Sequence, residues 1–443
     1  MKGQGSYWIK SGLFTILQRF SLLIFGFGSF FILIKILSKD DFGSWSLFLS
    51  ITSLIEVARS GLVKNALVKH LTTAESKEHA KIITASLGLN VILTFCSIFL
   101  LFIGANFLSS NWNTPELEPM FYIYMITTLL LIPFFQFEFI QQANLDFQGI
   151  FFSNFVRQGL FFLAIILSYF FDYKLALFDL AKLQIVTALS GIFVSYFFVR
   201  KYIVLTKSID WVWVKKLFNF GKYTFGTNVS HMIFSSVDQF LLGSLISKSA
   251  VASYNVALRV TNLVEVPTIS IAEIVFPQSA KRMESQGKEG VKYLYEKSVG
   301  VIMAIVLPAL VVVMVLPKFI ITIIADERYL STVPLLQITV LYTIFVPFAR
   351  QFGTVLDSMG KPQINFYFVV IGAIINATLN YFFIKNFGII GAAYGTLLSF
   401  TINFILNQIV LKKILNVEVL KVFYYMIEFY KEYWSKGLKY IKH

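Results

Sequence analysis

The chain has 443 residues, of which 57% are hydrophobic and 14% charged, and its formal net charge is +14. A soluble protein of this length needs a far more polar surface, so the composition excludes a soluble fold and indicates an integral membrane protein. In such a protein the basic residues belong to cytoplasmic loops, so we expect no nucleic-acid partner. The single Cys96 excludes an internal disulfide, and we expect it to pack within an apolar run.

Twelve segments are long and apolar enough to cross a membrane, which takes about 20 mostly apolar residues. They lie at about 11–37, 42–66, 82–108, 119–143, 150–171, 175–199, 217–243, 250–278, 298–323, 332–357, 364–385 and 389–411. The first is much longer than the core of a signal peptide, so we expect an uncleaved span. The predicted fold class is an all-α integral membrane protein with twelve transmembrane helices.

Basic residues gather in alternate connectors. The connectors at 68–81, 200–216 and 278–297 hold three, five and five Lys or Arg residues, and those on the opposite side hold no more than one each. Basic loops stay in the cytoplasm, so twelve spans place both termini there. The expected location is the bacterial inner membrane, crossed many times.

The tail at 417–443 differs from the spans because apolar residues recur in it every three or four positions, with lysines on other faces. These residues are Leu420, Phe423, Ile427, Tyr430, Trp434, Leu438 and Ile441. The pattern predicts an amphipathic helix suited to the anionic inner surface of the bilayer. Packing on a cytoplasmic loop is the alternative.

The chain contains an internal repeat. Shifted by 209 residues, positions 12–57 match 221–266 without a gap, with 15 identities in 46 positions. A second match at a shift of 211 residues aligns LDFQGIFFSNF (145–155) with LDSMGKPQINF (356–366). Because each half has six spans, both halves enter the membrane from the same side and the repeats are parallel. The predicted lobes are 1–206 and 207–412, followed by a tail helix at 413–443.

The second match carries a repeated turn, L-D-x-x-G. We expect Asp146 and Asp357 to cap the helix that follows each of them. Gly149 and Gly360 are then expected to relieve the turn.

The first repeat makes Glu56 and Glu265 counterparts, one in each lobe. A charge at membrane depth costs about 2.5–3.5 kcal/mol and nearly always faces a bundle interior or a wet cavity. Transporters built from two repeats hold their substrate between them. We therefore expect a cavity between the two lobes.

Several stretches together resemble the polysaccharide flippases, the Wzx-type O-antigen transporters. They are ILSKDDFGSWSL (36–47), VDQFLLGSLISKSAVASYNVALRV (237–260), LDSMGKPQ (356–363) and FGIIGAAYGTLLS (387–399). The resemblance implies a V-shaped bundle of two six-helix lobes, in a superfamily with the multidrug and toxin extrusion (MATE) antiporters and the lipid II flippases. It implies that the chain turns over an undecaprenyl-pyrophosphate-linked oligosaccharide from the cytoplasmic to the periplasmic leaflet. A polysaccharide polymerase and a chain-length regulator are candidate partners besides the membrane lipids, and we expect a monomer.

Five arginines lie inside the predicted spans: Arg19, Arg59, Arg157, Arg259 and Arg350. A guanidinium group binds pyrophosphate through forked, charge-assisted hydrogen bonds. Lipid II flippases are similar in using arginines on spans 1, 2 and 8, which favours the first, second and fourth of these residues as ligands. Snorkelling to the headgroups, or an ion pair with one of the two glutamates, is the alternative.

The acidic residues have other expected roles. Glu56 and Glu265 are expected to neutralise nearby arginines or make interlobe ion pairs, and coupling to a proton or sodium ion is the alternative for both and for Asp238. His231 changes charge near neutral pH, but a packing histidine is the preferred interpretation. Glu138 and Glu273 are expected to be structural. No metal site or bound cofactor is expected beyond a coupling ion.

Three other functions compete with the flippase. A drug or cation antiporter of the same fold would favour acids over arginines in its cavity. A membrane enzyme such as a polymerase or glycosyltransferase needs a long external loop, and the external connectors here hold about ten residues or fewer. A major-facilitator transporter would carry a different loop after its second span than KHLTTAESKEHAK (69–81). We therefore expect a transporter and no enzymatic activity.

Overall fold

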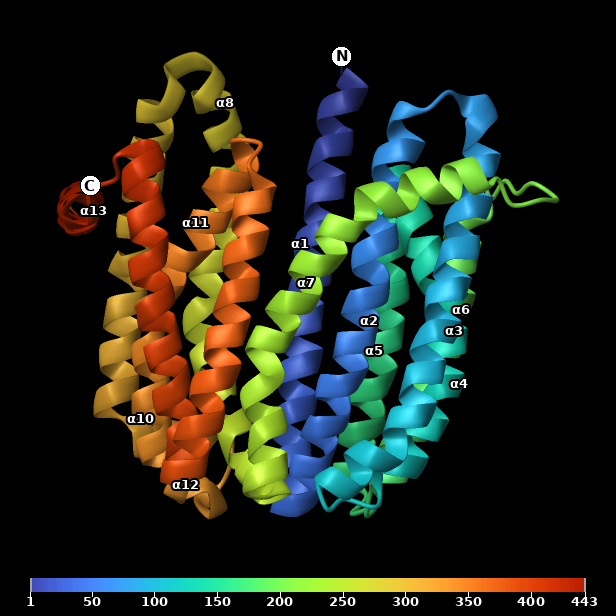
Figure 1. Cartoon of the computed structure of the whole chain (residues 1–443), viewed down its shortest axis with the longest axis horizontal. Coiled ribbons are helices and arrows are strands. Elements are labelled where there is room, and N and C mark those ends of the chain that lie inside the picture. The colour runs from blue at the N-terminus through green and yellow to red at the C-terminus, as the bar shows by residue number, and fades with distance from the viewer. Residues whose placement is uncertain (1, 442–443) are drawn as a thin grey trace. The chain divides into compact units, whose positions relative to one another are not determined.

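The computed structural model describes the backbone of residues 2–441 and the side chains of 13–432, apart from residues 223, 273, 277 and 280. Every element between residues 2 and 441 is a helix, and this part of the chain has no strand. The first half of the chain forms α1 (Lys2–Ile36), α2 (Lys39–Thr73), η1 (Ser76–Glu78), α3 (His79–Asn111), α4 (Leu117–Ala143), α5 (Phe147–Phe170), α6 (Leu177–Val199) and α7 (Trp211–Leu245) (Figure 1). The second half forms α8 (Lys248–Val315), α9 (Pro317–Ile324), η2 (Glu327–Thr332), α10 (Val333–Tyr342), α11 (Val346–Ser358), α12 (Pro362–Leu415) and α13 (Val419–Ile441).

Two of the long helices are each interrupted by one glycine with a positive φ. Gly287 (φ 64°) divides α8, and Gly388 (φ 62°) divides α12 between the predicted spans 364–385 and 389–411. Glycine adopts this left-handed conformation without the steric cost that a Cβ atom imposes. The predicted connector at 278–297 is wrong as a loop, because α8 continues through it on both sides of Gly287.

Nine helical segments of the described chain are long and apolar enough to cross a membrane. The helix α7 and residues 248–280 of α8 are not among them, and each of these stretches includes side chains outside the described residues. The all-helical membrane fold is therefore confirmed, and the number of twelve crossings stays a prediction.

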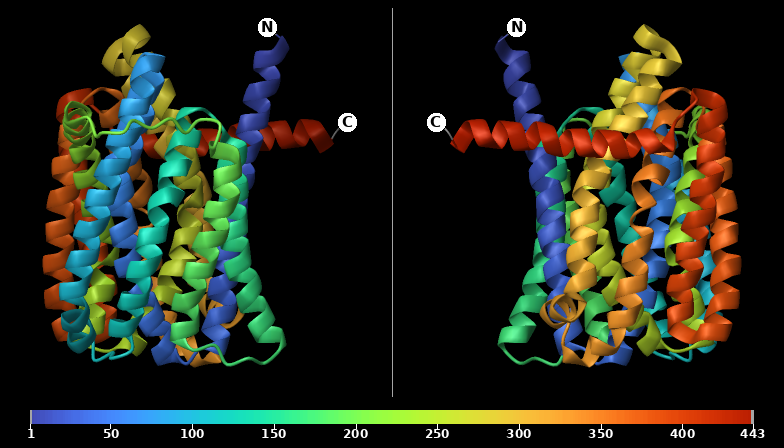
Figure 2. Two further views of the ribbon diagram at one scale, coloured as in Figure 1. Left: turned by 90° about the vertical axis from the view of Figure 1, so that its right-hand side faces the viewer. Right: turned by 90° about the vertical axis from the view of Figure 1, so that its left-hand side faces the viewer.

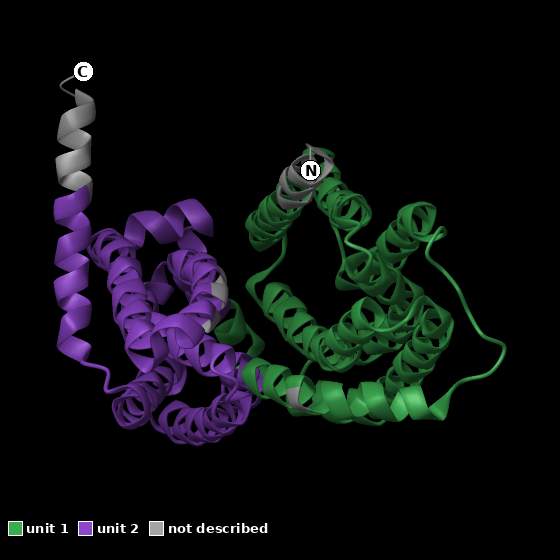
Figure 3. Ribbon diagram, turned by 90° about the horizontal axis from the view of Figure 1, so that it is seen from above, with its two compact units in different colours: residues 1–232, 247–252 green, residues 233–246, 253–443 purple. Residues whose placement is uncertain are grey.

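The chain forms two compact units, residues 1–232 with 247–252 and residues 233–246 with 253–443 (Figure 3). The first is called unit 1 and the second unit 2. The units divide within α7, whereas the predicted lobes divide at the repeat boundary near residue 206. The repeat-based boundaries stay a prediction.

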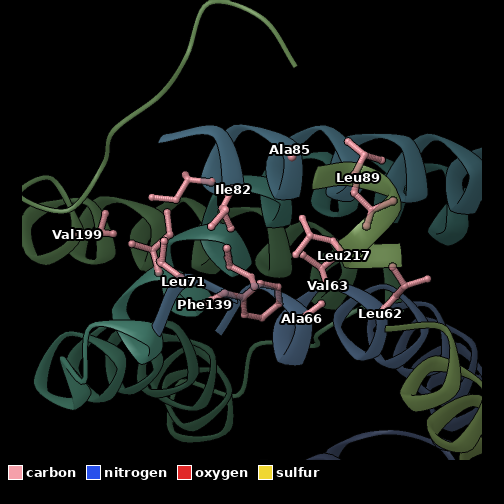
Figure 4. Packing of buried hydrophobic residues seen from close by; sticks show 14 residues of the cluster. Leu62, Val63, Ala66, Leu71, Ile82, Ala85, Leu89, Phe139, Val199 and Leu217 are labelled. Carbon is pink, nitrogen blue, oxygen red and sulfur yellow. The ribbon is translucent and has the colours of Figure 1, made fainter. Parts of the chain in front are cut away.

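Unit 1 is a helical bundle in which α4 packs against α2, α3 and α6, and α5 packs against α1 and α6. One buried cluster takes side chains from five helices, including Ala66, Ile82, Phe139, Val199 and Leu217 (Figure 4). These positions recur on the inner faces of long apolar helices, and small residues among them let the helices approach closely. The cluster fixes α2, α3 and α4, the helices that carry the polar groups described below.

In unit 2, α12 packs against α10 and α11. Its main buried cluster joins α8, α11, α12 and α13 through residues such as Tyr295, Phe352, Leu411 and Val422. The tail helix α13 is therefore part of the packed unit at its start.

The outer face of α3 is apolar and exposed, and Cys96 lies on it with Ile92, Phe95 and Phe99. The sequence predicts packing within an apolar run for Cys96, and the structure places its side chain on the exposed apolar surface of this helix. Residues at i, i+3, i+4 and i+7 share one helix face, and this face is the one left uncovered by the bundle.

The two repeated turns differ in detail. Asp146 caps α5 as predicted, since its side chain accepts a hydrogen bond from the Gly149 nitrogen (3.1 Å). Asp357 does not cap α12 and instead accepts from the side chain of Asn365 (3.1 Å), which corrects the prediction. Gly360 has a φ of 74° and relieves its turn, but Gly149 is helical, with an ideal Cβ position only 2.7 Å from the Cβ of Phe198. Close packing, not turn geometry, requires that glycine.

Candidate functional site

A buried polar cluster in unit 1 centres on Arg59, which projects from α2 and is only 2% exposed. Its Nη1 donates to the Thr94 hydroxyl on α3 (3.1 Å) and to the Thr128 carbonyl on α4 (2.9 Å). The guanidinium carbon lies 4.9 Å from the centre of the Phe135 ring, which is the geometry of a cation–π contact. Three helices thus hold one arginine side chain in a fixed orientation.

Two of the nitrogens of Arg59, Nε and Nη2, are buried and have no hydrogen-bond partner within the described part of the chain. An unsatisfied buried donor costs about 1–3 kcal/mol, and more when it is charged. Native structures rarely leave such groups unpaired without a functional reason. Nε and Nη2 lie side by side on the guanidinium plane, the pair of donors that grips two oxygens of a carboxylate or phosphate.

A second part of the cluster is the carboxylate of Glu56, one helical turn before Arg59 on α2. Its Oε1 accepts from the Tyr124 hydroxyl (2.9 Å) and lies 3.7 Å from Nη2 of Arg157 on α5. Arg157 in turn lies over the ring of Phe134, 4.9 Å from its centre. Glu56 is within electrostatic range of Arg59, but its ion pair is with Arg157.

The two arginines and one carboxylate leave this cluster with a formal charge of +1. The ion pair is long for a salt bridge, and both side chains are partly exposed, so it contributes on the order of 1 kcal/mol or less. An ion pair of this kind is easily exchanged for another anion. The interior of unit 1 is therefore suited to a group with more than one negative charge.

Sequence reasoning missed the neutral polar side chains that surround these charges. Asn90 on α3 donates to the Ile132 carbonyl (3.3 Å), and Gln136 on α4 donates to the Ser86 hydroxyl (2.7 Å). Ser86, Asn90 and Thr94 are spaced by four residues and share one buried face of α3. That spacing of polar residues within an apolar helix is visible in the sequence and would have identified the face.

The other charged residues predicted in unit 1 lie elsewhere on the bundle. Arg19 on α1 and His231 on α7 are exposed, in contrast to the buried Arg59. Their helices belong to the same unit, and α1 packs along α5, the helix that carries Arg157. Glu138 lies 4.0 Å from Lys64, an ion pair that fits its expected structural role, and the side chain of Glu273 lies outside the described residues.

Among the acids predicted as site residues in unit 2, Asp238 on the last part of α7 is buried. The hydroxyl of Tyr254 donates to its carboxylate, and so does the backbone nitrogen of Gln239 (2.9 Å). Tyr254 also has a hydrogen bond with Thr396 on α12. This chain of contacts links a carboxylate on α7 to the inner face of α12.

Thr396 in turn accepts from the amide of Asn380 (3.1 Å), which also donates to the side chain of Asn376. Both asparagines are fully buried. The Asn380 Oδ1 atom has no hydrogen-bond partner in the described residues. Carboxylate, amide and hydroxyl oxygens are the ligands of hard cations, and a buried carboxylate is also a proton acceptor. No group of three or more His, Cys, Asp or Glu residues forms a metal site in the part of the chain whose side chains are described.

The remaining predicted residues of unit 2 are half-buried or exposed. Glu265 and Arg259 on α8 are half-buried, and Arg350 on α11 is exposed. Arg350 lies within electrostatic range of Glu265. At the position that corresponds to Arg59 in the repeat, unit 2 has Thr268, so the buried arginine belongs to one half only.

The fold is shared with solved membrane transporters. The lipid II flippase MurJ in its inward closed conformation matches with a TM-score of 0.76 and 16% identity, over 94% of this chain and 90% of that one. An inward-facing multidrug resistance transporter of the MATE family matches with a TM-score of 0.72 and 14% identity, over 88% and 96%. At these identities the likeness establishes the fold alone.

The sequence also has curated relatives. It is 21% identical to the lipopolysaccharide biosynthesis protein WzxC of Escherichia coli over 401 residues, 89% of this chain and 79% of that protein. It is 26% identical to the probable low-salt glycan biosynthesis flippase Agl15 of Haloferax volcanii over 204 residues, 46% of this chain and 43% of that protein. The model of the polysaccharide biosynthesis protein family matches residues 32–334, well over half of the chain. The chain therefore belongs to the polysaccharide biosynthesis protein family, a family of membrane flippases, as the sequence motifs predicted.

Proposed function

We propose that the chain is a flippase that moves an undecaprenyl-pyrophosphate-linked oligosaccharide from the cytoplasmic to the periplasmic leaflet by alternating access. The product would serve the synthesis of O-antigen, capsule or exopolysaccharide. The observation that carries the proposal is a pair of buried guanidinium donors of Arg59 that no described residue of this family member accepts.

The anionic head of such a cargo suits the charged cluster of unit 1. A pyrophosphate group offers several oxygens to Nε and Nη2 of Arg59, which would relieve the cost of leaving them unsatisfied. Arg157 would exchange the carboxylate of Glu56 for a phosphate oxygen, because its ion pair at 3.7 Å is weak. Glu56 in this proposal holds Arg157 in place while no cargo is bound.

The names of two similar proteins support a lipid-linked saccharide as the cargo. One relative is a probable glycan biosynthesis flippase, and one structural neighbour is a lipid II flippase. Both descriptions concern those proteins, and their extension to this chain is part of the proposal. So are the cytoplasmic position of both termini and the monomeric state.

We further propose that transport is coupled to a proton or a sodium ion at Asp238. Its carboxylate is buried, and hydroxyl and amide oxygens lie close to it through Tyr254, Thr396 and Asn380. A buried carboxylate that has lost hydration gains most from a bound cation. Glu265, half-buried on α8, is a second candidate.

A MATE-type drug or cation antiporter is the second candidate function, favoured by the fold match to a multidrug transporter. The buried charge of unit 1 argues against it. A guanidinium group with free donors repels a cationic drug, and the same group attracts an anion.

The experiment that separates the two functions is complementation of a host strain that lacks this gene. Surface polysaccharide should return with the wild-type chain and fail to return with Arg59→Ala at equal protein level in the membrane. Sensitivity to cationic dyes should be the same in the presence and absence of the gene. A deletion strain with intact surface polysaccharide and raised dye sensitivity would reverse the order of the two functions.

A further inference from the structure

The tail helix α13 lies crosswise over the upright helices of unit 2 (Figure 2). It crosses α8 at Gly300, where an ideal Cβ position would lie 2.7 Å from the Val422 carbonyl oxygen and 2.8 Å from the Cβ of Tyr425. Only a glycine permits an approach this close between two helices. The crossing point is therefore fixed by the sequence of α8.

The start of α13 is also held by polar contacts. Glu418 accepts hydrogen bonds from Lys292 (3.0 Å) and Lys421 (3.1 Å), and these ammonium groups lower the pKa of the Glu418 carboxyl. The backbone nitrogen of Glu418 donates to Glu296 on α8 (2.9 Å). The contacts hold α13 in one orientation about its own axis.

With its orientation fixed, α13 presents three faces. One face packs on unit 2 through Val422, which is fully buried, and through Met426. A second face is polar and carries Lys421 and Glu428. The third face is uncovered and is made by five apolar side chains, Leu420, Phe423, Tyr424, Ile427 and Tyr430, with Lys431 following on the same side at its end.

The exposure of this third face requires an explanation. Leu420 is 82% and Ile427 50% exposed, although a helix that needs only to pack on protein buries its apolar residues on one stripe. At about 100° per residue the apolar positions of α13 cover well over half of its circumference. Such a wide apolar arc fits a helix with protein on one side and lipid on the next.

Contacts with α8 show which way each face points. On the side of the polar face, the ring of Tyr425 on α13 packs edge-on against the ring of Tyr293 on α8, with ring centres 5.6 Å apart. The basic residue Lys292 is the neighbour of Tyr293 on α8. On the side of the apolar face, the hydroxyl of Tyr430 donates to the carbonyl of Ala304. The apolar face therefore points along α8 in the direction of its later residues.

The surface of α8 changes character at the same place. Before the crossing it carries the exposed Lys288 and the half-buried Lys297, and after it come the exposed apolar side chains of Ile305, Val311 and Val312. An exposed apolar helix surface in a membrane protein is the surface that meets acyl chains. The uncovered face of α13 is continuous with that surface.

From this geometry we infer that α13 lies in the cytoplasmic interface of the bilayer, with Leu420, Phe423 and Ile427 among the acyl chains. Lys421 and Glu428 face the water, and Tyr424 and Tyr430 lie at headgroup level, where aromatic side chains are favoured. Because α13 is clamped to α8 at Gly300, it fixes the depth of unit 2 in the membrane. In this inference α13 combines the two roles considered for the tail, because one face packs on protein and another enters the lipid.

The test is site-directed spin labelling in a Cys96→Ala background, which is free of other cysteines. Single cysteines at Phe423, Ile427, Lys421 and Glu428 are labelled, and the full chain is reconstituted in vesicles of phosphatidylethanolamine and phosphatidylglycerol. Collision rates with oxygen, which concentrates in lipid, and with a water-soluble nickel chelate are then measured. The labels at Phe423 and Ile427 should show a ratio of oxygen to nickel collisions several-fold above that at Lys421 and Glu428.

Two results would overturn the inference. Equal nickel access at all four positions would mean that the apolar face lies in water. Protection of Ile427 from both reagents, with spin–spin broadening, would mean that a second copy of the chain covers the face. The measurement needs no cargo, so its failure leaves the proposed flippase activity untouched.

Discussion

Replacing Arg59 by methionine separates a ligand-binding arginine from a structural one. The substitution keeps the volume of a long flexible side chain and removes the charge. Arg59 donates to Thr94 and to the Thr128 carbonyl, so its loss removes a charge-assisted hydrogen bond to that carbonyl, at a cost of about 1.5–3 kcal/mol. The Thr94 hydroxyl remains bonded, since it also donates to the Asn90 carbonyl (2.7 Å).

The removal of a buried charge acts in the opposite direction. Taking a charge out of water is costly, and replacing a whole buried ion pair by apolar residues of similar volume is often neutral or stabilising by about 1–4 kcal/mol. Here a gain in stability should be favoured because Nε and Nη2 of Arg59 have no partner among the described side chains. The contributions nearly cancel, so Arg59→Met should change the free energy of unfolding by no more than about 2 kcal/mol in either direction.

The assay has two readouts. The apparent Tm of the purified protein in detergent should move by no more than a few degrees. Surface polysaccharide in a complemented deletion strain should be lost. Arg59→Lys is the matched control, because lysine keeps the charge but not the fork of two donors, and it should restore part of the polysaccharide at most. Full restoration by Arg59→Met, or a large fall in its Tm, would refute the reasoning.

Three further changes have defined outcomes. Gly43→Ala should destabilise the protein by about 1–3 kcal/mol, because the added Cβ would lie 1.9 Å from the Lys248 carbonyl oxygen. Gly26→Ala, where the Cβ meets open space, is the control and should be neutral or slightly stabilising. Equal Tm values for the two variants in a thermal melt would contradict this. Asp238→Asn should abolish the dependence of transport on a sodium or proton gradient in vesicles, and an unchanged dependence would remove Asp238 from the coupling. The pKa of the Glu418 carboxyl is lowered from 4.5, so its charged form holds α13 at neutral pH. Protease cleavage near α13 should therefore rise only as the pH falls through that lowered pKa. Cleavage independent of pH would show that the ion pairs of Glu418 do not hold the helix.

Much of the fold follows from apolar run length. The runs at 82–108 and 119–143 correspond to α3 and α4 with few residues of difference, because a helix must satisfy its own backbone in lipid and so extends over the whole apolar run. The helix at 278–297 was missed because its residues are polar and no hydropathy pattern separates a cytoplasmic loop from a cytoplasmic helix.

The sequence predicts which charged residues belong to the candidate site, but not which of them contact one another. An arginine and a glutamate three positions apart on α2 indicate a polar interior, and Arg59 and Glu56 both lie in one cluster. Their partners come from α3, α4 and α5, and partner choice depends on how those helices rotate in the bundle. The ion pair of Glu56 with Arg157, 101 positions away, is a tertiary contact that no local pattern encodes.

The measurement that bears most directly on the proposed function is translocation of a defined cargo by the purified protein. The chain is reconstituted in sealed vesicles that contain a fluorescent polyprenyl-pyrophosphate oligosaccharide, and a membrane-impermeant reductant quenches the outer leaflet. Vesicles with the wild-type chain should allow quenching of label from both leaflets, and vesicles with Arg59→Met should allow it from the outer leaflet only. Equal quenching in vesicles with wild-type chain, with the variant and without protein would contradict the account.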